Sequence, residues 1–138
     1  MNTERLKTML IEHEGSRAMP YTDTVGKVTI GVGRNLTDIG LFDNEIDLLL
    51  TNDIDRVIAD LNRELPWNTT LSEDHQLVLG DMCFNLGIGG LLGFKKFLAA
   101  MEAGDFPTAR KEMLDSKWAT QVGSRALDLA DMVYGITV

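Results

Sequence analysis

One short segment, residues 15–36, constrains the fold of this chain more than any other. It contains Pro20, which is excluded from a helix interior, and the β-branched run Val28-Thr29-Ile30. Between them, Val25-Gly26-Lys27 is typical of a hairpin turn. The sequence therefore predicts a small β-containing lobe here, although the rest of the chain has helical periodicity.

Helical patterns flank this lobe on both sides. Residues 3–13 repeat apolar positions at helical spacing, with Thr3 as the expected N-cap and Gly15 just past the end. A second pattern runs from Asp43, its expected N-cap, until Pro66 ends it. A helix of about 20 residues spans about 30 Å, which is long for so small a protein, so we expect it to connect two lobes.

Four shorter helical patterns follow. They begin near Ser72, Phe94, Phe106 and Ser124, and the glycine-rich stretch 87–90 breaks the first of them. The residues expected on the buried face of the last helix are Leu127, Ala130 and Val133.

Length and composition agree with a single domain, residues 1–138. The 138 residues, 44% of them hydrophobic, are enough to bury a core. We expect an α+β fold with a small β-containing N-terminal lobe at about 15–36 and a larger α-helical lobe. The helical lobe takes in about 66–138 together with the N-terminal helix, and a long helix at about 43–65 joins the two lobes.

The charge of the chain excludes one class of function. The formal net charge is −8, and residues 37–75, with ten Asp or Glu against two Lys or Arg, account for the excess. A nucleic-acid-binding protein would present a cluster of basic residues, and the sequence contains none. We therefore expect no nucleic-acid partner.

The sequence also lacks the patterns of membrane and export segments. No apolar run approaches the ~18 residues of a membrane span. The N-terminus goes directly into the amphipathic pattern, without the basic and apolar regions of a signal peptide. We expect a protein made in the cytoplasm, with no membrane anchor.

Residues that bind metals are few and poorly spaced. Cys83 is the only cysteine, so no intramolecular disulfide is possible, and its apolar helical stripe predicts a place in the core. Asp53 and Asp55 lie inside a helical pattern and lack the glycine turn of a calcium loop. The consecutive residues Glu12-His13-Glu14 do not share a helix face. We expect no metal and no cofactor.

Two carboxylates and a threonine carry the candidate chemistry. Glu14 ends the first helix, Asp23 follows nine positions later, and Thr29 follows six positions after that. Paired carboxyl groups on different elements are what glycoside hydrolysis requires. Each residue also fits an ordinary role when taken singly: a solvated acid, a turn aspartate and a strand threonine.

The spacing of these three residues carries a family resemblance. The segment Glu14-Gly15, Tyr21-x-Asp23-Thr24-x-Gly26-x-x-Thr29-Ile30-Gly31-x-Gly33 resembles the catalytic segment of phage-type lysozymes, the endolysins of glycoside hydrolase family 24. The resemblance implies a lysozyme-like fold in which Glu14 protonates the glycosidic oxygen. It further implies that Asp23 acts from the opposite side of the sugar and that Thr29 helps to hold the attacking water.

The same resemblance implies a reaction. This is hydrolysis of the β-1,4 bond between N-acetylmuramic acid and N-acetylglucosamine, with inversion at the anomeric carbon. An inverting pair of carboxyl groups stands ~6.5–9.5 Å apart, because a water must fit between them and the sugar. A helix end and a facing β-turn can supply such a separation.

Two distant blocks extend the resemblance. Residues 81–94 are similar to a helix–turn–helix across the family's cleft, in which Phe84 matches a substrate-contacting residue; a core aromatic is the alternative. Residues 116–126 are similar to a block whose arginine pairs with the catalytic glutamate. This implies that Arg125 orients Glu14, and a surface arginine is the alternative.

The chain departs from the family pattern at several positions. Arg34 stands where many members have histidine, and Asn35 stands where the family contacts sugar through its backbone, so we assign Asn35 to substrate binding. Glu112 replaces a substrate-contacting asparagine, and Phe97 replaces a serine. Well-known members are strongly basic, whereas this chain is acidic. The positive residues that could form a local basic patch are Arg17, Lys27, Arg34 and Arg125.

The sequence and the resemblance together imply an endolysin muramidase that degrades peptidoglycan by acid–base catalysis during host cell lysis. It would act as a monomer, stay in the host cytoplasm before lysis, and depend on a membrane-permeabilising holin to reach the cell wall. Other functions stay open: a catalytically weak glycan-binding protein, a lytic transglycosylase on a related fold, or a helical interaction module without a glycan ligand.

Overall fold

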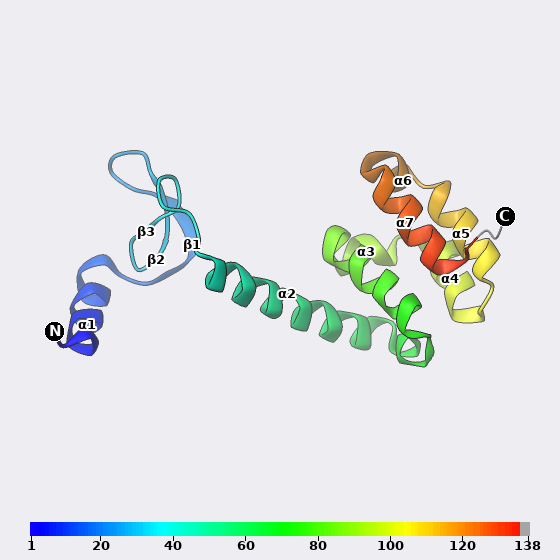
Figure 1. Ribbon diagram of the computed structural model, residues 1–138, viewed down its shortest axis with the longest axis horizontal. Helices are drawn as coiled ribbons and strands as arrows, with labels where there is room; N and C mark the ends of the chain where they lie inside the picture. Colours follow the sequence, from blue (N-terminus) through cyan, green and yellow to red (C-terminus); the bar gives the residue numbers. More distant parts are fainter. Residues whose placement is uncertain (136–138) are drawn as a thin grey trace. The chain divides into compact units, whose positions relative to one another are not determined.

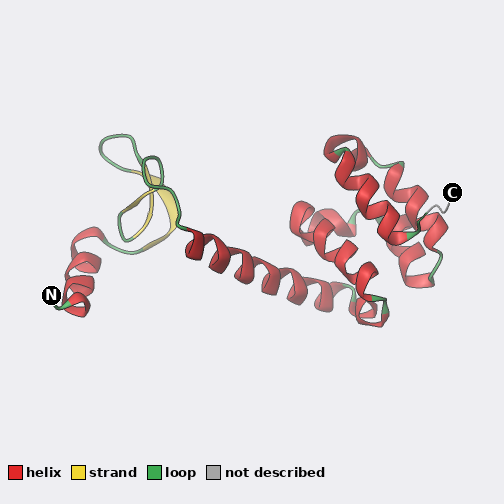
Figure 2. Cartoon of the chain, in the orientation of Figure 1, coloured by secondary structure: helices red, strands yellow, loops and turns green. Residues whose placement is uncertain are grey.

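The structure, a computed structural model, describes residues 1–135, which divide into two compact units between Leu49 and Leu50. The first unit contains a helix and a three-stranded antiparallel sheet, and the described part of the second consists of helices and their connections (Figures 1 and 2). The expected α+β fold class is therefore confirmed. Whether the N-terminal helix belongs with the helical lobe concerns both units, and that stays a prediction.

Helix α1, Thr3–Glu14, opens the first unit. Its N-cap is Asn2 rather than the expected Thr3: the Asn2 Oδ1 atom accepts a hydrogen bond of 3.0 Å from the Arg5 amide. Asn2 has extended backbone angles, as an N-cap requires, whereas Thr3 is already helical. Gly15, with φ +76°, follows the helix end as expected, and its amide donates to the Ile11 carbonyl over 2.9 Å.

The sheet lies in the segment that the sequence assigned to the β-lobe. Its strands are β1 (Arg17–Thr22), β2 (Val28–Gly31) and β3 (Arg34–Asn35), in that order and antiparallel. Tyr21 pairs with Thr29, and Thr29 pairs with Asn35, so Thr29 lies on the middle strand. The turn between β1 and β2 contains Gly26 at φ +85°, which confirms the predicted hairpin.

Helix α2, Asp43–Glu64, passes through the boundary between the units and matches the expected long helix. Its 22 residues give it a length of about 33 Å. Asp43 is its first residue rather than its cap. The capping interaction comes instead from the Glu45 carboxylate, which accepts from the Phe42 amide over 2.8 Å.

The second unit continues with a 3₁₀ helix, η1 (Pro66–Thr70), and helix α3 (Glu73–Leu92). Helix α3 begins where expected, and Ser72 caps it. Gly87, at φ +73° and ψ +161°, kinks α3, so the predicted break is a kink within one helix. The remaining helices are α4 (Lys95–Ala103), α5 (Phe106–Leu114), α6 (Lys117–Val122) and α7 (Ser124–Val133). Neither η1 nor α6 was predicted from the sequence.

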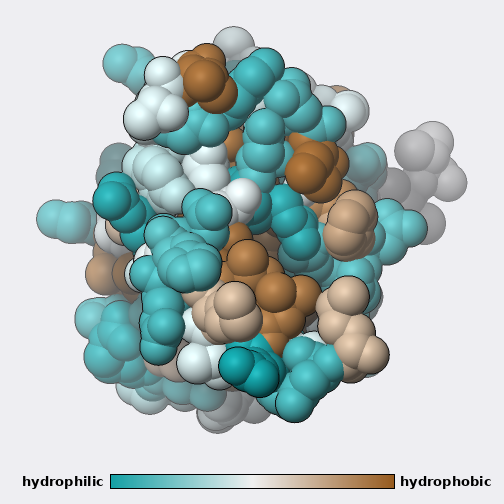
Figure 3. Space-filling model, turned by 90° about the vertical axis from the view of Figure 1, so that its left-hand side faces the viewer, coloured by the Kyte–Doolittle hydropathy of each residue, from teal (hydrophilic) through white to brown (hydrophobic). Residues whose placement is uncertain are grey.

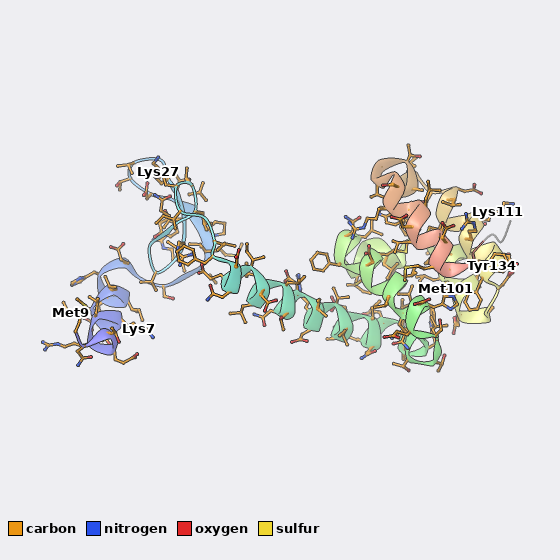
Figure 4. The ribbon with its side chains drawn as sticks, viewed as in Figure 1. Lys7, Met9, Lys27, Met101, Lys111 and Tyr134 are labelled. Carbon is orange, nitrogen blue, oxygen red and sulfur yellow. The ribbon has the colours of Figure 1, made fainter. Side chains whose placement is uncertain are left out.

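Residues from every α-helix of the second unit form its core. Leu79, Met82 and Met101 are fully buried, and Figure 4 shows Met101 among the helices. Cys83 is 2% exposed, which confirms its predicted place in the core. Leu127 was wrongly placed there: it is 54% exposed, and Leu129 takes its position on the buried face of α7.

Apolar side chains are also exposed on the surface. In α1, no residue is buried. Figure 3 shows exposed apolar side chains between hydrophilic ones on one face. Within residues 1–135 no single helix has the length and apolarity of a membrane span; α3 and α4 reach that combination only as a pair, with a bend of 106° between them.

Candidate active site

Glu14 is the last residue of α1, and its exposed side chain reaches the turn between β2 and β3. A Cβ atom placed on Gly33 would lie 3.1 Å from the Glu14 Oε2 atom and 3.3 Å from its Cδ atom. The carboxyl group therefore lies directly against the backbone of Gly33. Helix α1 and the sheet thus contribute to one site, because Gly15 turns the chain between them.

Asp23 occupies the turn between β1 and β2. Its Oδ1 atom accepts hydrogen bonds from the Val25 amide over 2.9 Å and from the Lys27 amide over 2.8 Å. This is the turn role that the sequence also allowed for Asp23. Both bonds end on Oδ1, so Oδ2 is the oxygen that can face a water or a sugar. The turn role and a catalytic role are compatible.

Thr29 is 4% exposed and lies on the middle strand. Its hydroxyl donates to the Lys27 carbonyl over 3.0 Å, and the Asp23 amide donates to the same oxygen over 2.9 Å. Lys27, labelled in Figure 4, thus links Asp23 and Thr29 through one peptide carbonyl. The structure brings together these two predicted residues, and the hydroxyl of Thr29 keeps its lone pairs to accept a hydrogen bond from water.

Asn35 faces Thr29 across the β2–β3 ladder. Its side chain is engaged in the following loop: Nδ2 donates to the Asp38 Oδ2 atom, and Oδ1 accepts from the Asp38 amide, each over 3.0 Å. Its carbonyl oxygen accepts from the amides of Ile39 and Gly40. Asn35 therefore organises this loop, and its contact with a sugar stays a prediction.

Arg34, which stands in place of the family's histidine, makes an ion pair of its own. Its Nη1 atom lies 2.6 Å from the Glu45 Oε1 atom, and its guanidinium group stacks over the Phe42 ring at 4.8 Å. The hydrogen bond from Arg34, followed by the one from the Phe42 amide, lowers the pKa of Glu45 below its usual value. The Arg34–Glu45 ion pair therefore connects β3 with the first turn of α2.

Two predicted residues of the second unit share a cavity of about 730 Å³ that α2, α3 and α7 line with mostly apolar side chains. Phe84 is 47% exposed in it, so the core alternative for Phe84 is wrong. Arg125 pairs there with Asp81: Nε lies 2.8 Å and Nη2 lies 2.7 Å from the Asp81 Oδ1 atom. Asp81 was not predicted from the sequence as this partner, and the pairing of Arg125 with Glu14, a residue of the other unit, stays a prediction.

Two of the positions where the chain departs from the family, Phe97 and Glu112, line a second cavity, of about 580 Å³, in the same unit. Phe97 is 1% exposed and forms part of the core beneath it. Glu112 lines the cavity together with Asp115, Lys95 and Lys96. Charges of both signs therefore surround this cavity, and Glu112 stands there in place of the asparagine that the family resemblance implies.

The expected basic patch takes residues from both units, so it stays a prediction, but the partners of its four cations are visible. Lys27 pairs with Asp38 at 3.2 Å, and Arg34 and Arg125 have the acidic partners given above. Arg17 stacks over the Tyr21 ring at 4.3 Å. Three of the four cations are therefore neutralised locally. Among residues 1–135, no group of three or more His, Cys, Asp or Glu side chains is placed to hold a metal ion.

An α+β fold whose helix-end glutamate lies against the β2–β3 turn of a sheet, and whose sheet and turns also carry a buried threonine and a half-buried aspartate, has the parts of an acid–base glycosidase. The sequence model of the phage lysozyme family matches residues 11–131. The chain therefore belongs to the phage lysozyme family, which is a family of glycoside hydrolases.

Relatives of the chain include two proteins of Dictyostelium discoideum, named probable T4-type lysozyme 2 and probable T4-type lysozyme 1. They are 26% and 25% identical over 150 residues, and each comparison covers 88% of this chain and 88% of the relative. The pre-baseplate central spike protein Gp5 of Enterobacteria phage T4 is 30% identical over 146 residues, which is 86% of this chain. The chain spans 25% of the length of that spike protein.

Proposed function

We propose that this protein is a muramidase that hydrolyses the β-1,4 bond between N-acetylmuramic acid and N-acetylglucosamine in bacterial peptidoglycan. The observation that carries the proposal is the placement of Glu14, Asp23 and Thr29 in one compact unit of a chain that belongs to the phage lysozyme family. Phe84 and Asn35 are the proposed substrate contacts, and Arg125 is the proposed orienting residue.

The three residues divide the chemistry between them. Glu14, which is exposed, gives its proton to the glycosidic oxygen as the bond to the anomeric carbon breaks. A water held by the Thr29 hydroxyl attacks that carbon from the opposite face. The Oδ2 atom of Asp23 takes the proton that the water loses, while Oδ1 stays bound to the turn. One attack from the opposite face inverts the configuration.

The biological setting is part of the same proposal. The protein acts as a monomeric endolysin in host cell lysis, stays in the host cytoplasm beforehand, and depends on a holin that permeabilises the membrane. Its bacteriolytic and antimicrobial action follows from degradation of the cell wall. Support comes from the match to the phage lysozyme family. Co-expression with and without a holin tests the proposal: lysis without the holin would contradict this dependence.

The mass of the products tests the reaction itself. Hydrolysis adds one water to each cleaved bond and leaves a reducing muramic acid, whereas a lytic transglycosylase leaves an anhydro-sugar with no added water. We expect mass spectrometry of digested peptidoglycan to show the hydrolytic products only. Anhydro-sugars would identify a transglycosylase.

A matched pair of variants tests the role of Glu14. Glu14→Gln keeps the size of the side chain but cannot donate the proton, so the clearing of peptidoglycan suspensions should slow by about 10²–10⁴-fold. Glu12→Gln, on the same exposed helix, should clear at the wild-type rate. If wild type and Glu14→Gln clear equally slowly while still binding the walls, the protein is a glycan-binding protein. Absence of any binding to chitooligosaccharides would favour a helical interaction module without a glycan ligand.

A further inference from the structure

Gly33 lies in the turn between β2 and β3, where the chain passes the carboxyl group of Glu14. Its φ is +69°, a value that favours glycine. This backbone angle alone does not distinguish the position, because Gly31, two residues earlier, has φ +67°. What distinguishes Gly33 is its surroundings.

A Cβ atom on Gly33 would meet three atoms of one side chain. It would lie 3.1 Å from Oε2, 3.3 Å from Cδ and 3.4 Å from Cγ of Glu14. A Cβ atom on Gly31 would have nothing within 4 Å. A side chain on Gly33 would therefore crowd the Glu14 carboxyl group, which would have to shift by a few tenths of an ångström.

The position of this carboxyl group matters more to catalysis than to folding. Glu14 is an exposed residue at a helix end, so its side chain can yield to a methyl group by rotating, at a small but measurable cost in stability. A general acid must lie within hydrogen-bonding distance of the glycosidic oxygen. A displacement of about 1 Å at a reacting group can cost about 10²-fold in rate.

We propose that Gly33 is a positioning residue for Glu14: the bare backbone of the β2–β3 turn sets where the carboxyl group of the general acid lies. The inference rests on the proposed function for its catalytic consequence. The contact between Gly33 and the Glu14 carboxyl group is a structural feature, so its effect on stability can be measured in a protein without activity.

The first experiment compares Gly33→Ala with Gly31→Ala, in the full chain acting on solubilised peptidoglycan. Both variants strain a glycine of nearly the same positive φ, and only the first crowds Glu14. We expect kcat to fall by about 10- to 100-fold in Gly33→Ala, with KM almost unchanged, while Gly31→Ala stays within about threefold of wild type. Equal kcat values in the two variants would overturn the proposal.

The second experiment measures the contact by thermal unfolding. Gly33→Ala should lower Tm more in the wild-type background than in Glu14→Ala, because the smaller side chain removes the atoms that the methyl group would meet. Gly31→Ala should lower Tm equally in both backgrounds. If Gly33→Ala is also background-independent, the contact does not exist and the proposal fails.

The two readouts separate the inference from the proposed function. Coupling of Gly33 to Glu14 in Tm, in a wild-type protein that cleaves no peptidoglycan, would support the positioning contact and overturn the function. If the wild-type protein cleaves peptidoglycan but Gly33 and Glu14 show no coupling in Tm, the proposed function is supported and the positioning contact is overturned. Should either alanine variant fail to fold, Gly33→Asn and Gly31→Asn repeat both comparisons, because asparagine tolerates positive φ better than alanine.

Discussion

The backbone of one residue, Lys27, connects Asp23 and Thr29, the two residues predicted to act together with Glu14. The Lys27 carbonyl accepts from the Asp23 amide and from the Thr29 hydroxyl, and the Lys27 amide donates to the Asp23 carboxylate. The turn that holds Asp23 therefore also orients Thr29. A change at Asp23 can act through the turn or through the reaction, and the two effects have to be separated.

Two substitutions of Asp23 separate them. Asp23→Asn keeps an oxygen that accepts from the Val25 and Lys27 amides, so the unfolding free energy should change by less than about 0.5 kcal/mol while the rate falls by about 10²-fold or more. Asp23→Ala loses both bonds and should also lose about 1–3 kcal/mol of stability. Urea unfolding and clearing rates are the measurements. A fully active Asp23→Asn would restrict Asp23 to its turn role.

At the scale of elements, the contact between β3 and α2 is a partly exposed ion pair. The side chains of Arg34 and Glu45 are 28% and 32% exposed, so solvent screens their attraction. The Glu45 carboxylate nevertheless serves two groups at once, since it accepts from Arg34 and from the Phe42 amide at the start of α2. Its charge state thereby affects both the strand contact and the helix cap.

The lowered pKa of Glu45 predicts the direction of a pH effect. Because the folded-state pKa lies below the usual value of 4.5, the ionised form stabilises the folded protein above about pH 4.5, and this is lost as pH falls through the folded-state pKa. The Tm of wild type should therefore exceed that of Glu45→Gln above pH 4.5, and the difference should shrink below it. Thermal unfolding between about pH 3 and 7 measures this.

Glu12→Gln is the control for this experiment, since Glu12 is an exposed acid on α1. Its Tm difference from wild type should change less with pH than that of Glu45→Gln. A Tm difference for Glu45→Gln that stays constant across this pH range would contradict the conclusion that the hydrogen bond from Arg34 lowers the pKa of Glu45.

At the scale of the whole molecule, the net charge of −8 opposes binding to an anionic cell wall. Lys27, Arg34 and Arg125 each pair with an acid, so these three cations offset little of it. Binding of peptidoglycan must then depend mainly on hydrogen bonds and apolar contacts, for which the exposed Phe84 ring is one candidate.

This repulsion predicts an unusual dependence on salt. The screening length falls from about 30 Å at 0.01 M salt to about 8 Å at 0.15 M, so the clearing rate should rise over this range. The double variant Asp47→Asn with Asp55→Asn should clear faster at low salt and respond less to added salt. Glu102→Gln with Asp128→Asn removes the same charge elsewhere and should behave alike if net charge is the cause. A rate that falls steadily with salt would contradict the prediction.

Local chemistry made several elements predictable from the sequence. The hairpin at Gly26, the helix at Phe106–Leu114 and the glycine that follows α1 depend on turn residues, prolines and caps within a few positions. The candidate site could be named in the same way, because Glu14, Asp23 and Thr29 lie in one continuous segment whose spacing resembles that of the family.

Contacts between distant residues were decided only in the tertiary structure. Arg125 and Asp81 are 44 positions apart, and their pairing follows from the packing of α7 against α3. The contact of Gly33 with Glu14 likewise needs the sheet to fold back onto the end of α1. The sequence by itself determined the α+β class, the family and the candidate acids, since these depend on local pattern. Partners and positions of the side chains depend on three-dimensional packing, which local periodicity does not encode.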